Sequence, residues 1–151
     1  LKHGIYIMVD HSTRYEIKDE RYIATYNHEV KTMLSMMKKT FLPSVLSYCK
    51  ELAETAAKTK AILPDAPISA ESKLLEKLSG LYTEISEKTE ALAEAEKAAE
   101  SMEDNIEKVT YFHYTILAKM DDLRSSVDTA EALIPDFFLP YPTYDELLFS
   151  V

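Results

Sequence analysis

Two apolar seams in the second half of the chain constrain its fold most. Apolar positions alternate in steps of four and three, first along residues 70–100 and then along residues 105–133. A 3.5-residue repeat sustained over this length is typical of long helices that pack by knobs into holes. The first seam comprises Leu74, Leu78, Leu81, Ile85, Lys88, Leu92, Ala95, Ala99 and Met102. The second comprises Ile106, Val109, His113, Ile116, Met120, Leu123, Val127, Ala130 and Ile134.

The stretch between the seams is too short for anything but a turn. We place this turn at Ser101–Asp104, which makes the two helices an antiparallel hairpin over residues 70–133. At 1.5 Å per residue, a helix of about 30 residues is roughly 45 Å long. Lys88 and His113 are polar intrusions in the seams. We expect His113 to be a hydrogen-bonded structural residue rather than a metal ligand.

The first half of the chain also predicts helix, over residues 14–62. Its apolar positions again step by three or four: Val30, Leu34, Met37, Phe41, Val45, Tyr48, Leu52 and Ala56. Pro43 lies inside this pattern, and a proline removes one backbone donor and clashes with the preceding turn. We therefore expect a kink or a break near Leu42, giving a bent helix pair.

The remaining segments connect or terminate these helices. Residues 1–12 read as a lead-in from an upstream domain, after which Ser12 or Thr13 is expected to cap a helix that begins at Arg14. Residues 63–69 hold two prolines and predict a loop, with Ser69 capping the next helix. Residues 135–151 form an aromatic, proline-containing tail that we expect to dock onto the bundle or a neighbour. Within it, Thr143 and Glu146 form a capping box that predicts a short helix from Tyr144 to Phe149.

Composition supports an all-α helical bundle in a single domain of 151 residues. There are only two glycines, Gly4 and Gly80, which argues against a turn-rich sheet fold. Rossmann and P-loop nucleotide sites need clustered glycines, so the sequence excludes them. No apolar run approaches membrane-spanning length and no signal peptide is visible, so we expect no membrane partner. Because the sequence begins with Leu1 rather than Met, we expect it to be a piece of a longer protein.

Charge is divided unevenly along the chain. Residues 1–60 hold ten Lys and Arg against seven Asp and Glu, whereas residues 61–151 hold seven against nineteen. An acidic second half repels phosphate backbones, so we expect no nucleic-acid partner. The acidic residues form either a solvated helix face or a docking surface for a basic partner, and the sequence leaves both open.

The side chains that could carry chemistry do not form a recognisable site. None of the four histidines, His3, His11, His28 and His113, has a second His or Cys at metal-ligand spacing. Cys49 is the single cysteine, which suits a reducing cytoplasm, and we expect it to be a small buried hydrophobe. Met33, Met36 and Met37 favour adaptable core packing over a ligand groove. We therefore predict no catalytic, cofactor-binding or metal-binding residues in this chain.

Two segments, residues 14–52 and 140–151, resemble the C-terminal region of type III glutamine synthetases, the long-chain bacterial form. The resemblance is ordered along the whole chain, and its tail motif is specific. The matching positions are Arg14 to Ile17, Tyr22, Thr32 to Leu34, Met36 to Lys39, Leu42, Pro43, Val45, Tyr48, Tyr141 to Tyr144 and Leu147 to Val151. Asp19, Ser44 and Asp145 depart from the family pattern at surface-compatible positions.

The resemblance implies a parent enzyme that ligates ammonia to glutamate with ATP and Mg²⁺ or Mn²⁺. It implies that the metal and nucleotide sites lie in upstream catalytic domains, so no cofactor is expected here. It also implies large double-ring homo-oligomers, with the upstream catalytic domain and neighbouring subunits as partners. On this interpretation the chain is a non-catalytic C-terminal domain with a structural, assembly or regulatory role, and its acidic hairpin projects from the catalytic body.

Two alternatives remain at this stage. The chain could be a stand-alone coiled-coil adaptor that binds a partner helix, using the Met-rich segment and the two seams. It could also be an independent metal-using helical enzyme, although the sequence signals no ligand set for one.

Overall fold

The structure of the protein, a computed structural model, describes residues 21–139. This part of the chain is helical and contains no β-strand, which confirms the all-α prediction. The elements in order are a helix over residues 21–36, η1 (Met37–Phe41), α2 (Leu42–Ile62), α3 (Ser69–Glu100), α4 (Asn105–Tyr111), η2 (Phe112–Ile116), α5 (Leu117–Glu131) and η3 (Asp136–Phe138). The helix over residues 21–36, η1 and α2 follow one another without a gap, and we call them together the first helix.

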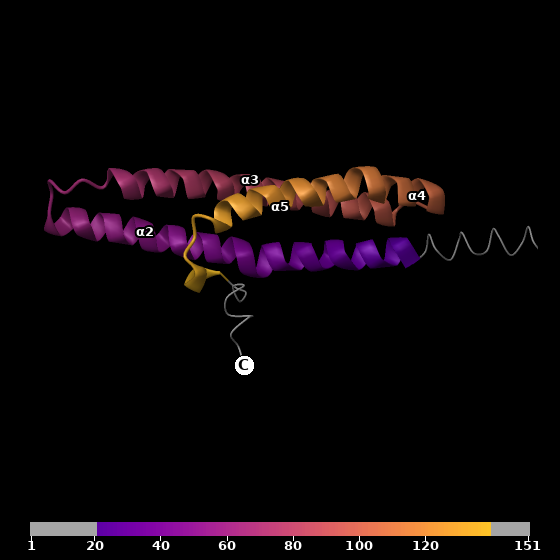
Figure 1. The fold of residues 1–151 in the computed structure, drawn as a ribbon, viewed down its shortest axis with the longest axis horizontal. Helices are drawn as coiled ribbons and strands as arrows, with labels where there is room; N and C mark the ends of the chain where they lie inside the picture. The colour runs from indigo at the N-terminus through magenta and orange to yellow at the C-terminus, as the bar shows by residue number, and fades with distance from the viewer. Residues whose placement is uncertain (1–20, 140–151) are drawn as a thin grey trace, which may run out of the picture.

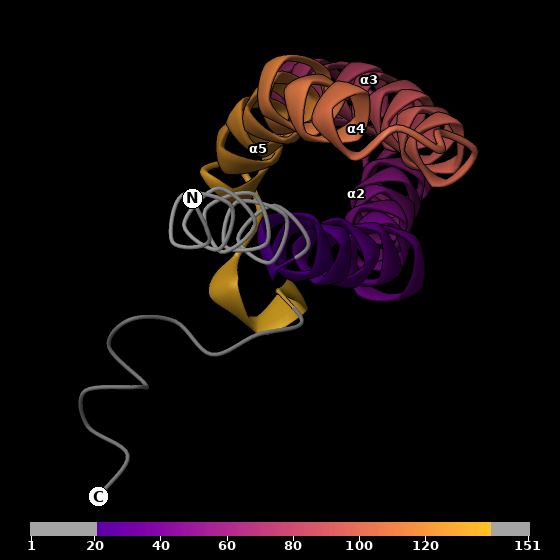
Figure 2. The same cartoon turned by 90° about the vertical axis from the view of Figure 1, so that its right-hand side faces the viewer.

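The elements form an up-down-up bundle (Figure 1). The first helix runs the length of the molecule, α3 returns antiparallel to it, and α4, η2 and α5 run back beside both. We call these three helical segments rods: the first helix, α3, and α4 together with η2 and α5. Viewed end-on, they surround a common axis (Figure 2). α3 packs against both α2 and α5, so the predicted hairpin is confirmed. The hairpin lies against the first helix, because its apolar side chains are buried there. Its projection from a catalytic body stays a prediction.

The third rod is shorter than the other two, and this divides the bundle into two halves (Figure 1). In one half, residues 21–45 and 78–134, α4, η2 and α5 cover the first helix and α3; we call this the three-helix half. Residues 46–77, from the end of α2 and the start of α3, form the two-helix half. Every buried residue of the described chain lies in the three-helix half, and none lies in the two-helix half.

The core of the three-helix half is built from the predicted apolar stripes. Its fully covered members come from all three rods: Val30, Phe41, Val45, Leu78, Ile85, Leu92, Phe112, Ile116 and Leu123. Ala95 and Ala99 are also buried, and their small side chains let the helices approach closely.

The second predicted seam is wrong at its beginning. Ile106 is 73% exposed and His113 is exposed, whereas Phe112 is 1% exposed and occupies the seam instead. The cause is η2, a π-helical turn in which the Leu117 N–H donates to the Phe112 carbonyl, five residues back. Such a turn holds one more residue than an α-turn, so it rotates the preceding helix face by one position.

A second π-turn, η1, precedes Pro43. Here the Leu42 N–H donates to the Met37 carbonyl, and the Ser44 hydroxyl donates to the Thr40 carbonyl at 2.9 Å. Proline has no N–H to donate, and local hydrogen bonds of this kind satisfy nearby carbonyls. The helix does not break at Pro43, since α2 continues to Ile62. A kink at this position stays a prediction.

The helix ends agree closely with the sequence, apart from one cap. Asp104 caps α4, and its Oδ1 accepts hydrogen bonds from the backbone N–H groups of Ile106 at 2.8 Å and Glu107 at 3.4 Å. The predicted cap at Ser69 is wrong, because Ser69 is the first residue of α3 and the N-cap residue of α3 is Ile68. The predicted helix start at Arg14 and the short helix from Tyr144 to Phe149 lie outside the described residues.

Candidate functional site

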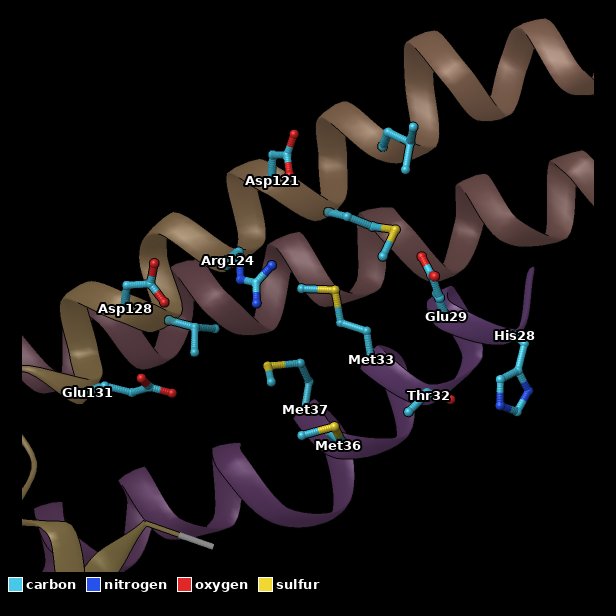
Figure 3. Close-up of a pocket in the computed structure, with 13 residues that line it drawn as sticks. His28, Glu29, Thr32, Met33, Met36, Met37, Asp121, Arg124, Asp128 and Glu131 are labelled. Carbon is cyan, nitrogen blue, oxygen red and sulfur yellow. The ribbon is translucent and has the colours of Figure 1, made fainter. Parts of the chain in front are cut away.

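A groove lies between the first helix and α5 (Figure 3). Its volume is about 680 Å³. We call its apolar lining the floor: Met33, Met36, Met37, Leu117, Met120 and Val127. We call its polar lining the rim: His28, Glu29, Thr32, Asp121, Arg124, Asp128 and Glu131. We call this surface the methionine groove.

The methionines of the first helix divide between core and groove. Met37 is 5% exposed and belongs to the core, whereas Met36 is 42% exposed. Figure 3 shows Met33 and Met37 directed from the first helix toward α5. Core packing therefore describes Met37, which also borders the groove, whereas Met36 lies at the surface. The sequence offered a ligand groove at these methionines only as the less favoured interpretation, and it could not show the second wall, which comes from α5.

Acidic side chains dominate the rim of the groove. Asp121, Arg124 and Asp128 follow one another along α5, with Arg124 between the two carboxylates (Figure 3). Glu29 lies across the groove on the first helix. The spacing of three and four residues places the α5 side chains on one helix face, and this stripe could have been found in the sequence. Its position beside methionines could not.

Lys88, the polar intrusion in the first seam, joins the two helices of the hairpin. Its Nζ lies 2.8 Å from Asp122 Oδ1 and 2.8 Å from Ser126 Oγ on α5, and 2.9 Å from Glu84 Oε1 on α3. The Ser126 hydroxyl also donates to Glu84 Oε1 at 2.7 Å. Donating hydrogen bonds to the Asp122 and Glu84 carboxylates raises the pKa of Lys88, and the Lys88 ammonium lowers the pKa of Glu84. The cluster is an interhelical network, and we expect it to favour one register of the hairpin.

Lys31 links the first helix to the end of α3 in the same way. Its Nζ donates to Glu100 Oε1 at 2.8 Å and lies 3.3 Å from Glu96 Oε1. The hydrogen bond to Glu100 raises the pKa of Lys31, and the Lys31 ammonium lowers the pKa of Glu100. Glu96 is 8% exposed, so Lys31 supplies the positive charge that a buried carboxylate needs.

The histidines and the cysteine are not brought together. His113 Nδ1 lies 3.3 Å from the Tyr22 hydroxyl, so His113 bridges to the first helix from an exposed position. His28 lies exposed at the rim of the methionine groove. Cys49 is half-buried, and burial raises the pKa of its thiol, which disfavours a reactive thiolate. His3 and His11 lie outside the described residues.

The beginning of the aromatic tail contacts α2. The Phe138 ring lies 5.0 Å from the Tyr48 ring, centroid to centroid, and 4.6 Å from the Phe137 ring. Phe137 itself is 80% exposed. Within the described residues, Phe138 therefore lies against α2. The docking of the whole tail, residues 135–151, stays a prediction, since residues 140–151 lie outside the described part.

Two properties of residues 21–139 bear on the site. Within this range, no group of three or more His, Cys, Asp or Glu side chains is arranged to hold a metal ion. No helix in the same range combines the length and the apolar character needed to cross a membrane.

Comparison with known proteins gives the family. The sequence model described as "Glutamine synthetase C-terminal domain" matches residues 1–60. A glutamine synthetase from Butyrivibrio fibrisolvens is 36% identical over 150 residues, which is 99% of this chain and 21% of that protein. The chain therefore spans about a fifth of the length of the curated relative it matches. Residues 1–60 belong to the glutamine synthetase C-terminal domain family, and the similarity to the Butyrivibrio fibrisolvens glutamine synthetase continues through the hairpin and the tail.

Proposed function

We propose that this chain is the non-catalytic C-terminal domain of a type III glutamine synthetase and that it supports subunit assembly or regulation. The parent enzyme would ligate ammonia to glutamate in the cytoplasm, with ATP and Mg²⁺ or Mn²⁺ held in its upstream catalytic domains. The domain would contact its own catalytic domain and neighbouring subunits of a double-ring homo-oligomer.

One observation carries the proposal. The chain aligns over 99% of its own length with a protein of which it is 21%, so it corresponds to one module of a much larger enzyme. The use of its polar side chains fits a structural module. Between helices, Lys31 pairs with Glu100 and Lys88 pairs with Asp122, so these charges hold rods together.

The first experiment tests the structural role in the full-length enzyme. Residues 70–133 are replaced by a short flexible linker, and assembly is measured by sedimentation velocity together with glutamine formation. We expect a smaller assembly or an altered turnover. If both are unchanged, the structural or regulatory role is wrong.

The deletion needs a matched control, because it uncovers the apolar face of the first helix. Three residues of this face are fully buried in the common core: Val30, Phe41 and Val45. The control carries the same deletion with these three residues changed to Gln. If this change restores normal assembly, the assembly defect came from non-specific association of the exposed apolar surface and not from loss of a structural element.

The second experiment tests the absence of catalysis. His28→Ala, Cys49→Ser and His113→Ala are made singly in the full-length enzyme. We expect turnover within about twofold of the parent, since loss of a general acid or base costs about 100-fold or more. A loss of that size in a correctly assembled variant would overturn the proposal.

A stand-alone adaptor remains the second candidate, and the methionine groove is the observation that favours it. The two candidate functions predict different coding sequences upstream of this chain. A glutamine synthetase catalytic domain encoded directly upstream in the same frame eliminates the stand-alone adaptor.

A further inference from the structure

We propose that the methionine groove binds an amphipathic helix with basic residues along its polar edges. The inference rests on the groove itself and not on the proposed role in the parent enzyme. The partner is defined by its chemistry: apolar side chains on one face, flanked by lysine or arginine.

The shape of the groove suits a helix. Its two walls, residues 28–37 of the first helix and residues 117–131 of α5, run in the same direction along the bundle (Figure 1). The α5 wall spans 15 residues, or roughly 22 Å at 1.5 Å per residue. A helix of four turns has this length. Since α3 packs against both α2 and α5, a helix in the groove would occupy the remaining corner of a four-helix bundle.

The floor of the groove suits apolar side chains of varied shape. Met33, Met36 and Met120 line it, and they are unbranched and can change rotamer to fit a partner. Met36 is 42% exposed in the groove. An exposed methionine on a concave surface gains burial when an apolar side chain enters, and this gain drives helix-in-groove recognition.

The rim sets the charge of the partner. Glu29, Asp121 and Asp128 place carboxylates on both walls, and Arg124 is the one cation between them. Carboxylates on both sides attract basic residues that flank an apolar face, and they repel acidic ones. The sequence left open whether the acidic residues form a docking surface for a basic partner. The methionine groove is the place where we expect such a partner to dock.

The test uses two designed 18-residue peptides and the chain with ¹³C-methyl-labelled methionines. One peptide has leucines on one helix face and lysines elsewhere, and the other replaces every lysine with glutamate. We expect the lysine peptide to shift the methyl signals of Met33, Met36 and Met120 in a saturable way. The signal of Met102, in the turn between α3 and α4, should not move and serves as an internal reference.

Matched variants separate specific binding from attraction to an acidic protein. Asp121→Lys with Asp128→Lys should weaken lysine-peptide binding at least ~10-fold, because like charges then face each other. Glu76→Lys with Glu90→Lys changes the net charge equally at exposed positions outside the groove and should alter binding less than about twofold. Circular dichroism checks that both variants remain helical.

Three results would overturn the proposal. The first is equal binding of the glutamate peptide, and the second is equal weakening by both double variants. The third is a shift of the groove methionines on raising the protein concentration alone, which would show that a second copy of the chain occupies the groove.

Discussion

The two halves of the bundle share α3 but use it differently. In the three-helix half, Ile85, Leu92 and Ala99 of α3 are buried among side chains from both other rods. In the two-helix half, Leu74 is only partly covered, and Ile62 and Leu63 at the tip are 78% and 60% exposed. Two helices alone leave one side of each stripe open, so a third rod is needed to close the core.

Ion pairs between helices follow the same division. In the three-helix half, Lys31 pairs with Glu100 and Lys88 pairs with Asp122 on another helix, and Lys88 also pairs with Glu84 one turn away on α3. In the two-helix half, Glu54 pairs with Lys50 and Lys58, one turn away on the same helix. Pairs between helices favour one register of the bundle, whereas exposed pairs within one helix contribute little. The comparison teaches that the three-helix half specifies the fold and the two-helix half extends it.

The largest expected effect comes from truncating the same residue type in each half. Leu92→Ala removes a fully buried side chain and should lower the free energy of unfolding by about 2–5 kcal/mol. Leu74→Ala, in the two-helix half, should cost about 1 kcal/mol or less because the site is already open to water. Urea denaturation measures both. Equal losses would mean that the two halves are equally well packed.

Lys88 tests whether interhelical charge stabilises the hairpin or specifies it. Lys88→Ala should cost about 1–2 kcal/mol, because Asp122, Ser126 and Glu84 lose a shared donor. Lys88→Met keeps the length of the side chain and fits an apolar seam, so it should be nearly neutral in stability. Its effect should appear instead as broadened or doubled amide signals in NMR spectra. A sharp single set of signals in Lys88→Met would remove the register role.

The paired carboxylates predict the pH dependence of stability. Lys31 and Lys88 lower the pKa values of Glu100 and Glu84 below the ordinary 4.5, so both glutamates stabilise the folded state at neutral pH. This contribution is lost as the pH falls through the lowered pKa values, below about pH 4.5. Glu84→Gln with Glu100→Gln should therefore show a smaller drop in thermal midpoint between about pH 5 and about pH 3 than the parent chain. An identical drop in both proteins contradicts the pairing.

The smallest effect is expected from the intrahelical pairs of the two-helix half. Lys58 lowers the pKa of Glu54, but the pair is exposed and lies within one helix. Glu54→Ala should leave the thermal midpoint unchanged within error, since such pairs compete with water and salt. A drop as large as that of Lys88→Ala would show that the two-helix half is held more tightly than its exposure indicates.

Much of this fold follows from periodicity. The spacing of Leu78, Ile85 and Leu92 predicts α3, and its observed limits, Ser69–Glu100, lie within one residue of the expected 70–100. The turn after Glu100 follows from the point where one seam ends and the next begins. Such signals are strong because a long helix repeats the same apolar spacing of three or four residues many times.

The π-turns could not be predicted in this way. η2 moves Phe112 into the seam and His113 out of it, because burying a phenylalanine ring is more favourable than burying an imidazole. This preference acts through tertiary packing, which a single helical period does not encode. The methionine groove as a whole was missed for a related reason. Its walls, near Met36 and Asp121, are about 85 residues apart in the chain, and only the bundle brings them together.

Hydrogen–deuterium exchange along α3 tests the division into halves most directly, because one continuous helix passes through both. We expect the backbone amides of residues 85–96 to exchange far more slowly than those of residues 72–77, with the change near Leu78, where burial begins. Uniform protection along the whole of α3 would contradict this account, since it would mean that the two-helix half is as firmly closed as the rest.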